Sequence, residues 1–95
     1  MIESEKLIEK KLTQEVKNVG GMSIKLIPLH IAGLPDRLLL FPGSKLIFVE
    51  TKTTGDKPRL IQIKIMGKIK DLGFDVRVID STRSILKLID DVTKK

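Results

Sequence analysis

The sequence predicts an α/β domain built on a mixed β-sheet flanked by helices, with its elements in the order αβββαβα. Apolar residues recur every three or four positions in three segments, which is typical of amphipathic helices. Four shorter segments are rich in apolar residues and are bounded by glycine, proline or polar residues, which is typical of strands. A chain of 95 residues can build one hydrophobic core, so we expect a single domain over residues 1–95.

The first half of the chain is expected to form one helix and three strands. Residues 3–19 present an apolar face suited to a helix, and Gly20 and Gly21 end it. That face consists of Ile8, Leu12, Val16 and Val19. The strands are expected at residues 22–30, 37–41 and 46–53, with residues 42–45 as the hairpin loop between the last two.

The second half is expected to form a helix, a strand and a final helix. Pro58 suits the first turn of a helix that runs to about Leu72, with an apolar stripe of Ile61, Ile65, Ile69 and Leu72. Residues 74–79 are expected to form a strand parallel to residues 46–53, because a strand–helix–strand unit needs a crossover. Ser81 is expected to cap the last helix, whose apolar face contains Ile85, Leu88, Ile89 and Val92.

The composition limits the possible functions. With 41% apolar and 32% charged residues the chain is typical of a soluble globular domain, and its apolar runs are shorter than the ~20 residues of a membrane span. The N-terminal residues lack the apolar stretch of an export signal, so we expect a cytoplasmic location. Cysteine is absent and His30 is the single histidine, which excludes thiolate and histidine-rich metal sites. Oxygen ligands would favour Mg²⁺, Mn²⁺ or Ca²⁺.

The net charge of +6 indicates a polyanionic partner, with nucleic acid first and an anionic membrane surface second. Solubility alone would also explain such a charge. The three phenylalanines and the absence of Tyr and Trp argue against a base-stacking platform. The basic residues expected near the candidate site suit phosphate contacts or a solvated basic face; they are Lys25, Arg37, Lys52, Lys57, Arg59, Lys64 and Lys68.

Charged residues gather at one end of the expected hairpin. With the turn centred near Ser44, Asp36 would lie across from Lys52, and Leu38 across from Glu50. Two carboxylates held close together repel each other unless a cation lies between them. A divalent metal would supply that cation and would polarise water or a phosphoryl oxygen, with the lysine beside it. The alternative interpretation is a set of salt bridges at a solvated sheet edge.

Two further residues favour a site over salt bridges. On a helix with about 100° per residue, Glu5 falls about 25° from the centre of the apolar stripe, whereas Glu9 and Glu15 fall about 65° and 55° away. Glu5 would then point most nearly toward the sheet, although its position also suits a helix N-terminus electrostatically. Gln62 lies near the start of the crossover helix and could return close to Glu50, or it could be an exposed helix residue.

The sequence resembles the VRR-NUC domain, a branch of the PD-(D/E)XK nuclease superfamily that occurs in phage and bacterial proteins. The similarity covers nearly the whole chain and is carried by EKLIEKKL (residues 5–12), VKNVGG (16–21), GLPDRL (33–38), PGS (42–44), FVETK (48–52), Gln62 and LGFDVRV (72–78). The superfamily core is αβββαβ, so the last helix would be an addition. The resemblance implies an Mg²⁺-dependent or Mn²⁺-dependent DNA endonuclease acting in a bacterial or phage-infected cell.

The resemblance also implies roles for individual residues. Asp36, Glu50 and the main-chain carbonyl of Thr51 would bind the metal, and Lys52 would be the catalytic lysine. Glu5 would match the helix glutamate, acting on the metal through a water, although Glu9 is an alternative for that role. Gln62 would match the glutamine of the family pattern. Phosphate contacts would come from Lys25, Arg37, Lys57 and Arg59.

Related nucleases imply the substrate: branched DNA, with four-way (Holliday) junctions cut by a homodimer, since two symmetric cuts need two sites. The last helix and the strand around Phe74 are the candidate dimer faces. Three alternatives remain open at this point. The chain could be a nuclease for flaps or other DNA forms, a basic module that binds branched or duplex DNA without cutting it, or a domain for a membrane surface or protein partner.

Overall fold

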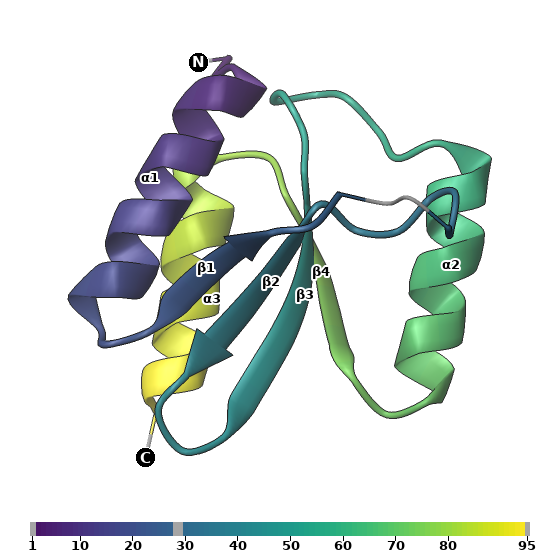
Figure 1. Cartoon of the computed structure of the whole chain (residues 1–95). Helices are drawn as coiled ribbons and strands as arrows, with labels where there is room; N and C mark the ends of the chain where they lie inside the picture. The colour runs from purple at the N-terminus through teal and green to yellow at the C-terminus, as the bar shows by residue number, and fades with distance from the viewer. Residues whose placement is uncertain (1, 28–29, 95) are drawn as a thin grey trace.

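Four strands form one mixed sheet that has helices on both faces (Figure 1). The computed structural model describes residues 2–27 and 30–94. Its elements are α1 (Glu5–Asn18), β1 (Met22–Lys25), β2 (Arg37–Phe41), β3 (Lys45–Thr51), α2 (Leu60–Asp71), β4 (Asp75–Ile79) and α3 (Thr82–Thr93). The strands lie in the order β1-β2-β3-β4, with β3 and β4 parallel and the other two pairs antiparallel. The element order and the parallel β3–β4 pair confirm the sequence prediction.

The helix ends follow from local chemistry. The Ser4 hydroxyl accepts a hydrogen bond from the Leu7 N–H at 3.2 Å and so caps the start of α1. Gly20 adopts a φ of 83°, which lets the chain turn out of α1 as predicted. The Ser81 hydroxyl accepts from the Ser84 N–H at the start of α3, which confirms the expected cap. None of the helices in the described residues is both long and apolar enough to span a membrane.

The hydrophobic core lies between the sheet and the helices α1 and α3, which cover the same face (Figure 1). Every second residue of β2 and β3 points into it, so Leu39, Ile47 and Val49 are buried. The helices contribute their predicted apolar faces, namely Ile8, Leu12, Val16, Ile85 and Leu88. This core fixes the end of β3 and the start of α1 relative to each other.

Helix α2 covers the opposite face, and here the predicted stripe was wrong. The buried residues of α2 are Gln62 and Met66, whereas Ile61 is 40% exposed and Leu72 is 76% exposed. The helix is rotated so that a polar side chain, Gln62, points at the sheet. A periodicity of apolar residues cannot predict this rotation, because burial of the glutamine depends on a hydrogen-bonding partner in another element.

Two predictions for the strands also need correction. The first strand ends at Lys25 instead of residue 30, and residues 28–29 lie outside the described part of the chain. In the hairpin, Leu38 pairs with Phe48 and Arg37 with Val49, so the register differs by two residues from the expected one. A shift of two residues keeps each side chain on its predicted face of the sheet. Asp36, directly before β2, is therefore brought to the level of Glu50 instead of Lys52.

Candidate metal centre

Polar side chains gather at one end of the sheet, where β2, β3, α1 and α2 meet. Asp36 precedes β2, Glu50 and Thr51 end β3, and Lys52 follows. Because side chains alternate along a strand, Thr51 faces α1 whereas Glu50 faces α2. The candidate site thus straddles the end of the sheet, with one part on each face.

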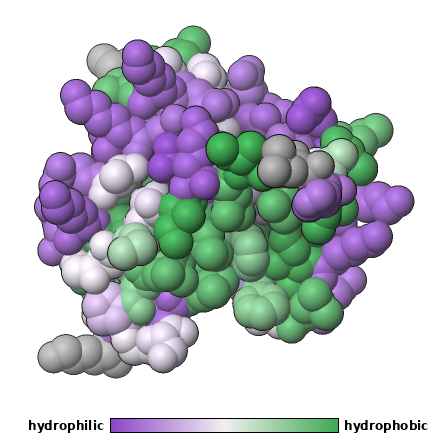
Figure 2. Space-filling model, in the orientation of Figure 1, coloured by the Kyte–Doolittle hydropathy of each residue, from purple (hydrophilic) through white to green (hydrophobic). Residues whose placement is uncertain are grey.

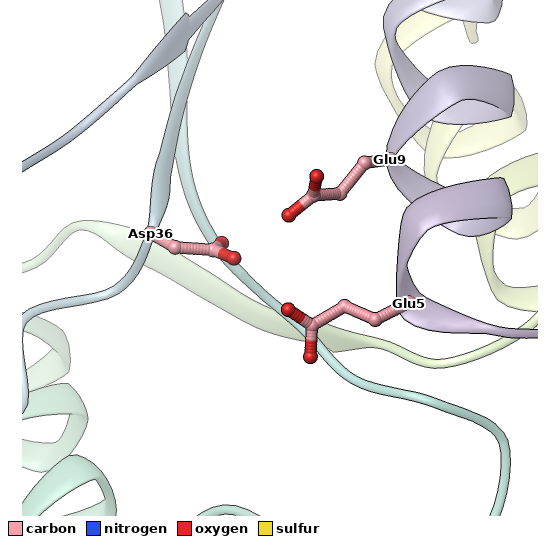
Figure 3. A group of neighbouring side chains, drawn as sticks. All are labelled: Glu5, Glu9 and Asp36. Carbon is pink, nitrogen blue, oxygen red and sulfur yellow. The ribbon is translucent and has the colours of Figure 1, made fainter.

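Three carboxylates meet on the side of α1. Oxygen atoms of Glu5, Glu9 and Asp36 all lie within 4.8 Å of one another, and Figure 3 shows the two helix glutamates reaching toward Asp36. Burial, together with the negative charges of neighbouring carboxylates, raises the pKa of both Glu5 and Asp36. In Asp36 the hydrogen bonds from Thr51 oppose this shift but do not cancel it. The cluster is therefore short of positive charge.

Thr51 and Arg37 hold this cluster in place. The Thr51 N–H donates to Asp36 Oδ1 at 3.1 Å, and its hydroxyl donates to Asp36 Oδ2, with Glu9 Oε1 3.3 Å away. The Arg37 guanidinium lies 3.4 Å from Glu9 Oε2 and its side chain is 12% exposed. Arg37 therefore lies inside the site, beside Glu9, and its phosphate contact stays a prediction.

Glu50 lies on the other side of the sheet end and is only 4% exposed. Its Oε2 accepts a hydrogen bond from Gln62 Nε2 at 3.0 Å and lies 3.3 Å from Lys52 Nζ. Gln62 is fixed in turn, because its Oε1 accepts from the Arg59 N–H at 2.8 Å at the start of α2. Gln62 thus positions Glu50. The alternative interpretation, in which Gln62 is an exposed helix residue, is wrong.

The second oxygen of Glu50, Oε1, is buried and has no hydrogen-bond partner within the described residues. Burial, followed by the negative charge of Asp36, raises the pKa of Glu50, while Lys52 opposes the shift. A buried carboxylate oxygen without a partner costs free energy unless a cation or a donor binds it. Together with the crowded oxygens of Glu5, Glu9 and Asp36, this donor set fits a hard divalent cation that takes oxygen ligands.

Two residues outside the predicted set shape the site. Gly33 has a φ of +84°, and a Cβ atom there would lie 2.6 Å from the Ile61 carbonyl oxygen, so only glycine lets the loop before Asp36 contact α2 this closely. The Glu3 carboxylate accepts from the Thr82 N–H at 2.7 Å and from Lys11 Nζ at 2.7 Å. Glu3 thereby ties the start of α1 to the start of α3, 79 residues along the chain. No pattern in the sequence indicates such a remote pair.

The remaining predicted residues lie around this centre. Lys25, Lys57 and Arg59 are exposed, and Lys57 and Arg59 lie on the segment that leads into α2. The main-chain carbonyl of Thr51, expected as a metal ligand, belongs to the last residue of β3 at the same sheet end. His30 is exposed, and no contact with a described residue links it to the site.

Comparisons with known proteins add two relatives. The chain is 42% identical over 74 residues to "Putative nuclease p44" of Acyrthosiphon pisum secondary endosymbiont phage 1, a match that covers 78% of this chain and 80% of that protein. Its fold is similar to a solved VRR_NUC domain, with a TM-score of 0.86 and 27% identity, covering 93% of this chain and 97% of that one. No family model matches the sequence.

Proposed function

This chain belongs to the VRR-NUC family of nucleases, and we propose that it is a metal-dependent, structure-selective DNA endonuclease. Its proposed reaction is hydrolysis of phosphodiester bonds at four-way junctions, carried out by a homodimer. The phage relative supports an action inside a bacterial or phage-infected cell. The observation that carries the proposal is the carboxylate cluster of Glu5, Glu9 and Asp36, together with the ion pair of Glu50 and Lys52 at the same sheet end.

The proposed ligands of an Mg²⁺ or Mn²⁺ ion are Asp36, Glu50 and the Thr51 carbonyl, with Glu5 acting through a water. Glu9 lies in the same cluster as Glu5 and is a second candidate on α1. When bound, the cation polarises a phosphodiester and the attacking water. The rest of the chain holds the ligands: Thr51 orients Asp36, and Gln62 orients Glu50.

Lys52 is the proposed catalytic cation of the chain itself. Its ammonium lies 3.3 Å from Glu50 Oε2 and its side chain is 16% exposed, so it is fixed at the site yet open to a ligand. From this position it can donate a hydrogen bond to a phosphate oxygen on which negative charge develops, or orient the attacking water. Loss of one such donor typically lowers kcat about 10²–10³-fold.

DNA binding is proposed to rest on phosphate contacts. Lys25, Lys57 and Arg59 are exposed, and Arg59 adjoins the site through its hydrogen bond to Gln62. Such contacts position a DNA backbone without reading its sequence, which agrees with selection by DNA shape. The net charge of +6 also favours association with a polyanion.

The test is a cleavage assay on synthetic four-way junction, flap, fork, single-stranded and linear duplex DNA, with MgCl₂ or with EDTA. We expect metal-dependent, paired cuts across the four-way junction. Flap-only cleavage would assign the enzyme to a different branched substrate. Intact substrate with both MgCl₂ and EDTA, alongside intact binding, would leave only a DNA-binding module.

Matched variants separate catalysis from binding. Lys52→Ala and Asp36→Ala should abolish cleavage while the binding constant measured in Ca²⁺ stays within a few-fold. Lys57→Ala, which lies outside the carboxylate cluster, should instead weaken binding and lower its salt dependence by about one unit of the log–log slope. Loss of binding in step with cleavage for Lys52→Ala would contradict the proposed role.

A further inference from the structure

One face of the sheet is apolar but only partly covered. The side chains of β1, β2 and β3 on the face of α2 form two cross-strand rows: Met22, Leu40 and Leu46, and then Ile24, Leu38 and Phe48. Helix α2 packs chiefly on β4, so these six residues, which we call the open face, remain partly accessible. Figure 2 shows a continuous hydrophobic surface here, bordered by hydrophilic residues toward the metal centre.

One flank of α2 extends the open face. At about 100° per residue, Ile61, Ile65 and Leu72 project from the same side of the helix. The loop before β2 approaches α2 at Ile61, so this flank faces β2 and not the outer side. Leu72 is 76% exposed, and Phe74 next to it is 46% exposed while its ring meets Phe48 edge to face.

The size of this surface approaches that of a protein interface. Met22 is 60% exposed, Leu72 76%, Phe74 46% and Ile61 40%, whereas the other six side chains of the open face and the α2 flank are half-buried. With roughly 100 Å² for each of the four exposed side chains and about a third of that for each half-buried one, the surface offers on the order of 600 Å². The largest apolar patch of a typical monomer is about 300–600 Å², and each partner in a stable complex contributes about 800 Å². The six positions of the open face include no charged residue, which makes it a poor surface for DNA phosphates.

We propose that a second copy of this chain docks on the open face. One half of the face carries a ridge, α2, and the other half is bare. Such a surface is self-complementary, because a twofold axis parallel to the strands places α2 of each copy on the bare half of the other. A twofold axis across the strands would instead stack the two α2 helices on each other and leave both bare halves uncovered.

This arrangement determines where the two active sites lie. A rotation about an axis parallel to the strands keeps the direction of the strands, so both metal centres open at the same end of the dimer. Two sites on one side of a dimer can reach two strands of a single branched DNA molecule. The proposal rests on the proposed function for its choice of a second copy, and it names the interface of that homodimer.

The first test is the oligomeric state, measured by sedimentation velocity without DNA or metal. We expect a dimer at tens of micromolar, and at least a 100-fold weaker dimer for Met22→Glu/Leu72→Glu, since each buried glutamate would lack a partner. Leu86→Glu is the matched control, because Leu86 is 54% exposed on α3 and lies off the open face. Unchanged thermal unfolding of both variants at low protein concentration excludes misfolding.

The second test uses the absence of cysteine in the natural chain. Met22 and Leu72 both lie at the end of the sheet far from the metal centre. Mixing Met22→Cys with Leu72→Cys chains under oxidation should give a heterodimeric disulfide, whereas Leu86→Cys in place of Leu72→Cys should not. The proposal is overturned if the wild type stays monomeric at about 100 µM. It is also overturned if Leu86→Glu dissociates the dimer as much as Met22→Glu/Leu72→Glu does.

Two further outcomes separate the possible failures. A monomer that co-sediments with phosphatidylglycerol vesicles through Met22 and Leu72 would assign the open face to a lipid surface and overturn the proposed dimer. A dimer that forms as expected but cleaves no DNA would contradict the nuclease function and leave the interface standing. A dissociated Met22→Glu/Leu72→Glu variant should retain single metal-dependent nicks while losing paired cuts.

Discussion

Asp36→Asn should stabilise the protein in EDTA and remove its response to metal. The side chain keeps its shape: its oxygen can still accept from the Thr51 N–H, and its amide can donate to the Thr51 hydroxyl, which then donates to Glu9. What changes is one negative charge among three carboxylates whose oxygens lie within 4.8 Å of one another.

The magnitude follows from Coulomb's law. At such distances each repulsion is worth about 1 kcal/mol at the dielectric constant of water and about 3 kcal/mol at an effective value of 20. Against this, each Thr51 hydrogen bond loses about 1 kcal/mol when its acceptor becomes neutral. The pKa of Asp36 is raised, first by burial and to a smaller extent by the charge of Glu9, so these two effects outweigh the Thr51 hydrogen bonds. We therefore expect a net gain on the order of 1 kcal/mol, or a Tm higher by about 4–8 °C.

Metal should reverse this order. A cation at 100 times its Kd stabilises the wild type by about 2.7 kcal/mol, and the variant should lose most of that gain. In thermal unfolding, the variant should therefore have the higher Tm in EDTA and the wild type the higher Tm in MgCl₂. Because the pKa of Asp36 is raised, lowering the pH toward it should also stabilise the metal-free wild type and bring it closer to the variant.

Asp91→Asn is the matched control. Lys87 and Arg77 lower the pKa of Asp91, so removal of its charge should destabilise the fold and leave the response to metal intact. The reasoning is refuted if Asp36→Asn is less stable than the wild type in EDTA. It is also refuted if MgCl₂ raises both Tm values equally.

Three further changes test the support of the site. Gly33→Ala should lower stability by about 1–3 kcal/mol and reduce cleavage. Gly43→Ala has a similar φ of +82° but open space around it, so its stability should fall only by the cost of the left-handed backbone conformation. Unfolding and cleavage assays compare the two variants. Thr51→Val should keep the fold but weaken Mg²⁺ binding several-fold by titration calorimetry, because Asp36 loses a hydroxyl donor; unchanged affinity would contradict this positioning role. Glu3→Gln should be less stable than the wild type at pH 7, with the difference shrinking from pH 4.5 toward 2, because the pKa of Glu3 is lowered from 4.5 to about 2 and its charged form stabilises the fold; a constant difference in Tm across that range would count against it.

The local elements were predictable because their causes are local. Ser81 caps a helix wherever it precedes an amphipathic segment, and the apolar face of α1 is periodic in the sequence itself. The grouping of Asp36, Glu50 and Lys52 at one sheet end also follows from a hairpin and the alternation of side chains. Their catalytic roles stay predictions until the variants are measured.

Errors arose where the outcome depends on contacts between distant segments. The rotation of α2 is set by Gln62, whose amide bonds to Glu50 across the sheet, and apolar periodicity alone pointed to Ile61 and Leu72. The hairpin register differed by two residues, since turn conformation was inferred from sequence position. The ion pair between Arg37 and Glu9 was not predicted, because Glu9 comes from a helix 28 positions earlier in the chain.

The sequence by itself determined the order of the elements, the charge of +6 and the residue types that a hard cation needs. Only the tertiary structure decided that Glu9 joins Glu5 and Asp36. Only it decided, for the described part of the chain, that one oxygen of Glu50 is buried without a partner and that half of a sheet face stays open. The physical reason is that helix propensity, capping and side-chain alternation act over a few residues, whereas burial and electrostatic repulsion depend on which remote segments the fold brings together.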